Sequence, residues 1–174
     1  MLTAPHKQPG FTLVELVVAI AVFAILLLLG MPAYTAWMQN SQIRVSAEGI
    51  LNGLQTARAE AVRRNQPILF ELSGSGAGWS VALDSDGTVL QIRPNFEGNK
   101  TAVVTPTPSN ASEVTFGTLG QVVPNSDTGQ PTMTQVDVTS SALASARNLR
   151  VVISPAGEVR MCDPALPSSD PRAC

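Results

Sequence analysis

A long apolar stretch near the N-terminus is the strongest feature in the pattern of hydrophobic and polar positions. Between Phe11 and Met31 the only polar side chains belong to Thr12 and Glu15. About 21 helical residues at 1.5 Å each span roughly 30 Å, the thickness of the hydrocarbon layer of a bilayer. A single segment in lipid satisfies its backbone hydrogen bonds only as a helix. The pattern therefore predicts a membrane-spanning helix over residues 11–32.

A second helical segment, over residues 33–65, follows with a different pattern. Pro32 removes one backbone hydrogen bond, so we expect the helix to loosen or kink there. Tyr34 and Trp37 then fall where amphipathic rings favour the membrane interface. Beyond them, apolar side chains recur at spacings of three and four residues, which predicts one apolar stripe. The members of this stripe are Ile43, Ala47, Ile50, Leu51, Leu54, Ala57 and Ala61.

The opposite flank of the second segment carries many charges. Opposite charges four residues apart predict two ion pairs, Arg44–Glu48 and Glu60–Arg64. We interpret Arg58, Arg63 and Arg64 as part of this solvated flank, in preference to a surface that contacts a partner. The segment is therefore expected to lay its apolar stripe on a sheet and to leave its charged flank in water.

Short β-type runs separated by Gly, Pro, Asn and Ser fill residues 66–174, as in antiparallel sheets. The candidate strands are Ile68–Leu72, Trp79–Leu83, Thr88–Ile92, Ala102–Thr105, Val114–Phe116, Gln121–Val123, Thr134–Thr139, Leu149–Ser154 and Glu158–Cys162. The stretches Asn95–Ser112 and Pro124–Pro131 are interpreted as long exposed loops. The predicted fold class is α+β, with a long N-terminal helix packed on a C-terminal antiparallel β-sheet head.

Two short patterns have more than one interpretation. Asp84 to Gly87 lies between two predicted strands and is most simply a hairpin turn, with Gly87 supplying a positive φ. A calcium loop is the alternative, but no downstream bidentate glutamate follows at the spacing that calcium loops use. Gly49 and Gly53 lie four residues apart, which we interpret as close packing against strands in preference to a dimerisation motif.

The composition argues against most enzyme chemistry. The chain has 174 residues with a formal net charge of −2, so no basic field over the whole protein attracts nucleic acid. His6, near the N-terminus, is the single histidine, and the two cysteines alone make no zinc site. Without a further histidine the usual nucleophile–base pairs are absent. We therefore expect no enzyme activity, no cofactor and no metal.

Two ordinary explanations of the apolar stretch fit poorly. A secretory signal peptide has a shorter apolar region followed by a small-residue cleavage site. Here the small residue, Gly10, precedes the apolar run. A plain membrane anchor leaves Glu15 unexplained, because a carboxylate in hydrocarbon costs at least a few kcal/mol. Lys7 gives the N-terminal segment a positive charge, which favours the cytoplasmic side.

Gly10-Phe11-Thr12-Leu13-Val14-Glu15, a long apolar run and Pro32 at its far end resemble the class III signal of type IV pilins and type II secretion pseudopilins. The resemblance implies that residues 1–10 are a leader, which a prepilin peptidase removes between Gly10 and Phe11. It also implies methylation of the new N-terminus at Phe11. Glu15 would then pair with the N-terminal amine of a neighbouring subunit, which supplies the cation that a buried carboxylate needs.

Further motifs are similar to the FimT/FimU and GspH group of minor pilins and minor pseudopilins. They are the run Gln55–Asn65, Trp79, the Asp84–Gly87 turn and Ser154–Gly157. The resemblance implies a pilin fold, other pilin or pseudopilin subunits as partners, and a single-pass anchor in the bacterial inner membrane. The head would lie in the periplasm before the subunit enters a pilus or pseudopilus.

Cys162 and Cys174 form an even pair in a domain expected to be exported. Because the periplasm is oxidising, we predict a disulfide between them, with two unpaired thiols as the alternative. A crosslink over this loop is worth on the order of 3 kcal/mol.

The leading hypothesis is a structural or initiating subunit of a type IV pilus or type II secretion pseudopilus. A pilus-associated DNA receptor is the alternative, because some members of the group carry a Gly-Arg-x-Arg motif. Here that stretch runs from Gly157 to Arg160 with Glu158 at the first arginine position, where a carboxylate repels phosphate. The candidate DNA contacts are Arg150, Arg160 and Arg172. A membrane-tethered enzyme is the third hypothesis and lacks a nucleophile–base pair.

Overall fold

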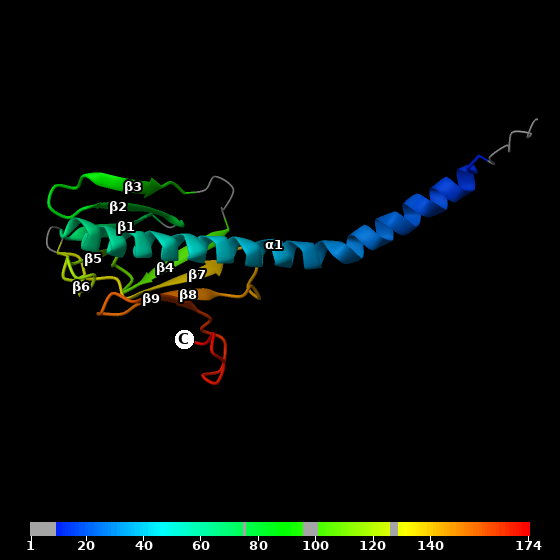
Figure 1. Cartoon of the computed structure of the whole chain (residues 1–174). Helices are drawn as coiled ribbons and strands as arrows, with labels where there is room; N and C mark the ends of the chain where they lie inside the picture. The colour runs from blue at the N-terminus through cyan, green and yellow to red at the C-terminus, as the bar shows by residue number, and fades with distance from the viewer. Residues whose placement is uncertain (1–9, 75, 96–100, 126–128) are drawn as a thin grey trace, which may run out of the picture. The chain divides into compact units, whose positions relative to one another are not determined.

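The structure is a computed structural model that describes residues 10–74, 76–95, 101–125 and 129–174. Within these ranges one helix, α1 (Leu13–Arg64), precedes nine β-strands (Figure 1). The predicted α+β class is confirmed. The chain divides into two compact units, one that ends at Ala36 and one from Trp37 to Cys174, called here the head unit. Residues 1–9 of the predicted leader lie outside the described ranges.

A local capping motif sets the start of α1. The backbone N–H of Glu15 donates to the Thr12 side-chain oxygen at 3.2 Å, and the N–H of Leu16 donates to the Thr12 carbonyl at 3.2 Å. Thr12 is therefore the N-cap, and Glu15 stands three residues later, where a capping box carries its glutamate. The prediction placed the helix start two residues earlier, at Phe11. Thr12 begins the helix because its hydroxyl satisfies an otherwise orphaned N–H.

The end of α1 is set by Asn65, which adopts a positive φ of 52°. The N–H of Asn65 donates to the Val62 carbonyl, and that of Gln66 donates to the Ala61 carbonyl. These two bonds make a Schellman motif, and asparagine tolerates the left-handed conformation that the motif requires. Pro67 follows and prevents further helix. The predicted end of the helix is confirmed to within one residue.

All nine predicted strands are present, with ends that differ by one or two residues. They are β1 (Ile68–Ser73), β2 (Gly78–Leu83), β3 (Val89–Arg93), β4 (Ala102–Thr107), β5 (Glu113–Phe116), β6 (Val122–Val123), β7 (Gln135–Ser140), β8 (Leu149–Ile153) and β9 (Val159–Cys162). They form two antiparallel sheets rather than one, with the orders β3-β2-β1-β5-β6 and β4-β7-β8-β9. We call these the first and the second sheet.

The prediction of two long exposed loops is wrong in part. The stretch Asn95–Ser112 contains β4, which was itself among the predicted strands, and the burial of Ala102 and Val104 in that strand and of Ala111 beyond it contradicts an exposed loop. In the stretch Pro124–Pro131, Asn125 is buried because its side-chain amide donates to the carbonyls of Glu113 and Gln130. Polar composition misled the prediction, since hydrogen bonds allow a polar residue to be buried.

The core of the head unit joins α1 to both sheets. Ile43, Ile50 and Leu54 of the predicted stripe are buried in one cluster with side chains of both sheets, such as Phe70 on β1 and Val151 on β8. Figure 1 shows the C-terminal part of α1 lying along the two sheets. Burial of each large side chain is worth about 1.5–3 kcal/mol. The helix stripe is therefore the common surface on which both sheets pack.

Candidate assembly site

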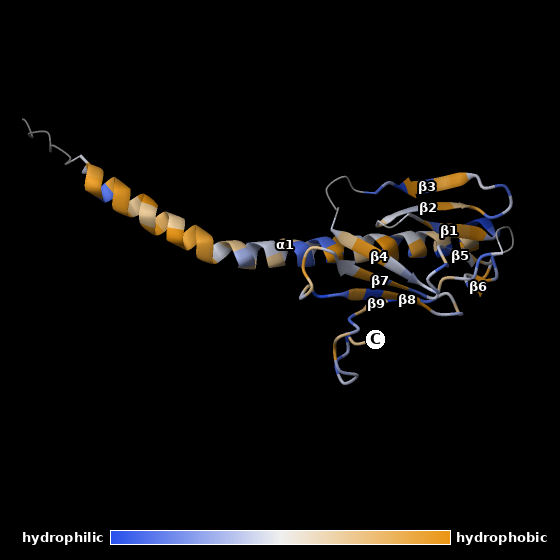
Figure 2. Cartoon of the chain, turned by 180° about the vertical axis from the view of Figure 1, so that it is seen from behind, coloured by the Kyte–Doolittle hydropathy of each residue, from blue (hydrophilic) through white to orange (hydrophobic). Residues whose placement is uncertain are grey.

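The N-terminal part of α1 presents a continuous apolar surface. Every residue from Gly10 to Thr35 is exposed, including Phe11, at 87%. Figure 2 shows the hydrophobic colouring concentrated along this part of the helix. Among the described residues, α1 is the one helix that is long and apolar enough to cross a bilayer. Soluble monomers rarely expose so large an apolar area, so this surface requires lipid or protein to cover it.

Glu15 is the single acidic residue in this apolar part of α1. It lies in the first helical turn, where the aligned backbone dipoles and free N–H groups favour a negative charge. Phe11 lies four residues earlier and Gly10 precedes it, both exposed and before the first helical residue. The role of Thr12 was missed at the level of sequence, although the spacing Thr-x-x-Glu signals a cap.

Pro32 lies inside α1, and the helix continues through it. The Thr35 hydroxyl donates to the Pro32 carbonyl at 2.9 Å. This is a local bond back to the preceding turn, and it does not replace the hydrogen bond that proline removes, which belongs to the Leu28 carbonyl four residues before Pro32. The expected loosening of the helix at Pro32 stays a prediction.

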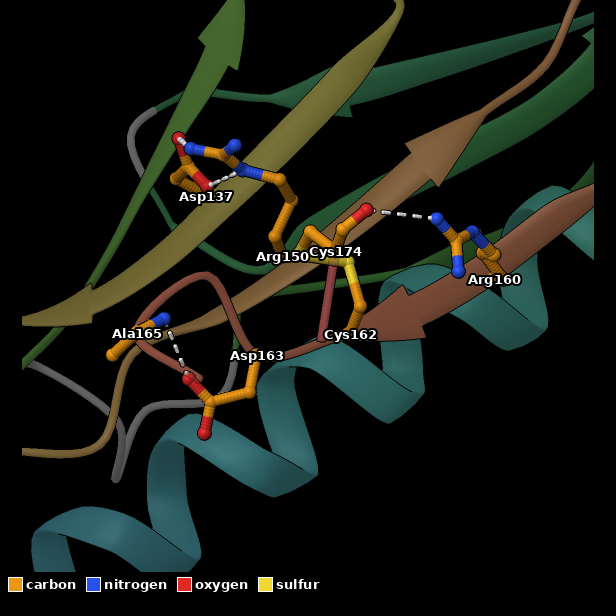
Figure 3. The surroundings of a disulfide bond; sticks show 7 residues. All are labelled: Asp137, Arg150, Arg160, Cys162, Asp163, Ala165 and Cys174. Atoms are coloured by element: carbon orange, nitrogen blue, oxygen red, sulfur yellow. Dashed lines mark hydrogen bonds and ion pairs between the residues drawn. A yellow bond between two sulfur atoms is a disulfide. The ribbon is translucent and has the colours of Figure 1, made fainter. Parts of the chain in front are cut away.

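Cys162 and Cys174 form a disulfide, as predicted, with Cα atoms 5.1 Å apart (Figure 3). Cys162 ends β9 and is buried, and it is followed by Asp163, which is also buried. Asp163 accepts hydrogen bonds from Nε of Arg147 at 2.6 Å and from the N–H of Ala165 at 3.0 Å. Burial alone would raise the pKa of Asp163, but these bonds outweigh burial and lower it. The disulfide loop is thus held beside the second sheet by a covalent bond and by an ion pair whose carboxylate is buried and whose guanidinium is half-exposed.

The three arginines proposed as DNA contacts are all engaged within the chain. Arg150 on β8 makes a two-pronged ion pair with Asp137 on β7, at 2.6 and 3.0 Å. Arg160 on β9 donates to the backbone carbonyl oxygen of Cys174 at 3.1 Å, as Figure 3 shows. Arg172 pairs with Asp170 at 2.8 Å. Strand register places Arg150 and Arg160 on one face of the second sheet, but Asp137 cancels the charge of Arg150.

The flank of α1 is arranged as predicted. Arg44 pairs with Glu48 at 2.8 Å, and Glu60 accepts from both Arg63 and Arg64. The hydrogen bond from Arg63, followed by that from Arg64, lowers the pKa of Glu60 to about 2. Arg58 is not part of the solvated flank, because its Nε donates to the Gly120 carbonyl at 3.1 Å. That bond ties α1 to the turn between β5 and β6.

The Asp84–Gly87 segment is the predicted hairpin turn. Gly87 has a φ of 69°, and its N–H donates to the Leu83 carbonyl at 2.9 Å. Asp86 accepts from the N–H of Thr88 at 2.9 Å, which lowers its pKa. Over the residues that the structure describes, no three His, Cys, Asp or Glu side chains gather as they would around a metal ion.

A long helix with an exposed apolar N-terminal part, and a C-terminal part packed on antiparallel sheets, defines the class of pilin-like subunits. Residues 46–157 match the family model described as type II transport protein GspH, and residues 5–31 match the prokaryotic N-terminal methylation motif. The chain belongs to the GspH family. It is a pilin or pseudopilin of a type IV pilus or a type II secretion system, and the comparisons do not support the DNA-receptor alternative.

Known relatives agree with this assignment. A type IV major alpha-pilin of Moraxella bovis is 31% identical over 131 residues, which are 75% of this chain and 79% of the relative. The crystal structure of the type IV minor pilin FimU of Pseudomonas aeruginosa matches with a TM-score of 0.53 and 21% identity, over 75% of this chain and 98% of FimU. The structure of the minor pseudopilin EpsH of the type 2 secretion system of Vibrio cholerae matches with a TM-score of 0.51 and 13% identity, over 72% of this chain and 99% of EpsH. These two structures share the fold.

Proposed function

We propose that this chain is a structural or initiating subunit, without enzyme activity, that is anchored in the bacterial inner membrane before it enters a filament. In this proposal a prepilin peptidase cleaves between Gly10 and Phe11 and methylates Phe11. The segments are then a leader (1–10), a transmembrane and filament-core helix (11–32), an amphipathic half-helix (33–65) and a periplasmic head (66–174). Other pilin or pseudopilin subunits are the partners in the filament.

The exposed apolar part of α1 is the observation that carries the proposal. Large apolar side chains such as Phe23 and Leu26 are each about 61% exposed, whereas those of the stripe in the head unit are buried. Burying them is worth about 1.5–3 kcal/mol each. Lipid supplies that burial while the subunit waits in the membrane, and neighbouring helices supply it in a filament.

Glu15 gives the apolar contact between subunits a defined register. Among packed helices an unpaired carboxylate is costly, and removing the partner of a buried pair costs about 3–5 kcal/mol. Cleavage after Gly10 would free an amine at Phe11, four residues away in sequence. Within one chain only a short segment joins Phe11 to Glu15, and the helix begins inside it, at Leu13. Both features favour pairing of Glu15 with the amine of a neighbouring subunit instead.

A pair of matched variants tests this role. Glu15→Gln removes the charge in the apolar part, and Glu48→Gln makes the same chemical change on the half-exposed flank of the head unit. We expect both variants to fold and to insert into the membrane, and only Glu15→Gln to be depleted from sheared filaments relative to the inner-membrane fraction. Equal incorporation of the two variants would contradict the pairing. A partial loss for Glu15→Gln would place the subunit at or near a filament tip.

A further inference from the structure

A groove in the head unit lies between the first turns of α1 in that unit and the disulfide-bonded segment. Its volume is about 560 Å³, within the roughly 300–1,000 Å³ of pockets that hold small molecules. Its apolar lining consists of Trp37 on α1, Leu149 on β8, Met161 on β9 and Pro171 in the disulfide loop. Trp37 is 65% exposed, so this lining is open to a partner.

The charged side chains around the groove are neutralised within the chain. Three arginines line it, and each makes an ion pair with a carboxylate of the same chain. The pairs are Arg44–Glu48, Arg147–Asp163 and Arg172–Asp170. An anionic ligand would have to compete with these carboxylates, whereas an uncharged apolar group can use the apolar lining and leave the pairs intact. The groove therefore suits an uncharged apolar side chain.

An apolar projection lies at the other end of the head unit. Leu119, in the turn between β5 and β6, is 82% exposed, more than any other large hydrophobic side chain that the structure describes in residues 37–174. Val62 on α1 is half-exposed beside it, since a Cβ added at Gly120 would lie 3.2 Å from Val62 Cγ2. Pro155, in the turn between β8 and β9, is exposed as well. We call Val62, Leu119 and Pro155 the apolar tip.

Contacts between three elements hold the apolar tip in place. Nε of Arg58 on α1 donates to the Gly120 carbonyl at 3.1 Å, and the N–H of Val122 donates to the Pro155 carbonyl at 3.0 Å. Gly157 has a φ of 79°, and a Cβ added there would collide with the Gly120 carbonyl oxygen, so the two turns touch directly. A preorganised tip loses little conformational freedom on binding.

The groove and the apolar tip lie at opposite ends of one stretch of α1. About 30 Å of helix separates Ser41, which lines the groove, from Val62 in the tip. Figure 1 shows β6, which follows the turn of Leu119, at the C-terminal end of α1. The tip of a chain therefore cannot reach the groove of the same chain. Two such surfaces at different places make a heterologous contact between copies, which leaves one tip and one groove free and continues into an open chain.

We propose that the apolar tip of one copy of this chain docks into the groove of a second copy. Leu119 of the first copy then packs on the ring of Trp37 and on Met161 of the second. A second copy supplies an uncharged apolar group for a groove without net charge, and repeated contacts of this kind join heads in an open row. The inference deepens the proposed function, and it rests on that function for the place of the contact in a filament.

The test uses the full chain in maltoside micelles, which cover the apolar N-terminal part of α1. Leu119→Ser removes the tip, and Ser41→Arg fills the groove from an exposed position on α1. The control is Ile92→Ser, which changes a 65% exposed apolar side chain on β3, outside both surfaces. Sedimentation velocity over a range of concentrations measures association, and thermal melting followed by circular dichroism shows that each variant is folded.

We expect the wild type and Ile92→Ser to associate beyond dimers as the concentration rises. Leu119→Ser and Ser41→Arg should each need about tenfold higher concentrations for the same association, because each loses the burial of one large apolar side chain.

A mixture of Leu119→Ser and Ser41→Arg retains one intact groove and one intact tip. It should therefore form dimers at concentrations where each variant alone is monomeric, and it should grow no further. A mixture that stays monomeric would overturn the proposal.

A wild type that stays monomeric would also overturn it and leave the groove to a different subunit. Association that neither variant weakens would do the same and would assign the contact to the apolar part of α1. Because sedimentation is measured on the uncleaved, solubilised chain, a failure of cleavage or of filament entry would refute the proposed function and leave this result unchanged.

Discussion

Trp79 on β2 donates its indole N–H to the backbone carbonyl of Gly49 on α1, at 2.9 Å. One helical turn later, at Gly53, an added Cβ would lie 2.6 Å from the same indole ring and 2.8 Å from the ring of Phe70. Gly53 thus lets the first sheet approach the helix closely, and Gly49 contributes its backbone carbonyl. This confirms the interpretation of the Gly49–Gly53 spacing as a contact with strands.

The variant Gly53→Ala should destabilise the head unit by about 1–2 kcal/mol. Overpacking against two buried rings costs about 1–3 kcal/mol, and the better helix propensity of alanine returns up to about 1 kcal/mol. The measurement is the midpoint of denaturant unfolding of the full chain, followed by tryptophan emission in a Trp37→Phe background so that Trp79 alone reports.

Gly49→Ala is the matched control for this variant. There the Cβ would meet the guanidinium of Arg93, the mobile end of a long side chain that can move aside. We expect Gly49→Ala to be neutral or slightly stabilising. Equal destabilisation by the two variants would show that the indole packing does not set the approach of the sheet.

Loss of the disulfide should lower the stability of the head unit by about 3 kcal/mol, because the bond closes a loop with a sequence separation of 12. The variant replaces both cysteines by serine, and the measurement is the melting temperature with and without reductant. Reductant should lower the melting temperature of the wild type toward that of the variant and leave the variant unchanged. Free thiols in protein freshly isolated from the periplasm would contradict the pairing in the cell.

Asp163 should make stability depend on pH in the acidic range. Its pKa in the folded chain is lowered from the ordinary 3.8, since hydrogen bonds from Arg147 and Ala165 outweigh the effect of burial. A depressed carboxylate pKa contributes stability that is complete above about pH 4 and is lost as the pH falls through the folded-state value. Asp163→Asn should therefore cost about 2 kcal/mol at pH 7. The difference from wild type should shrink between pH 4 and pH 2, and a difference independent of pH would refute the ion pair.

The strands and both helix ends were predictable because local chemistry determines them. Each of these elements is determined by the few residues around it. The examples are the alternation of apolar residues along the strands, Gly87 in its turn and Asn65 before Pro67. The capping role of Thr12 was visible in the same way, in the spacing to Glu15, although the prediction began the helix at Phe11.

The remaining features depend on contacts between residues distant in sequence. No local pattern indicates that β4 pairs with β7 rather than with a strand of the first sheet. None indicates that Asn125 is buried with its amide bonded to the Glu113 and Gln130 carbonyls. The pairing of Arg147 with Asp163, across 16 positions, is likewise invisible in the sequence.

We propose that this chain is made as a precursor and processed at its N-terminus before assembly. Intact-mass and peptide mass spectrometry of the full chain, isolated from a host with an active prepilin peptidase, measures this directly. We expect an N-terminus at Phe11 that carries one methyl group, and an unprocessed chain when Gly10 is replaced by valine. An intact Met1 in the mature protein, or a cut beyond the apolar run after Met31, would contradict it.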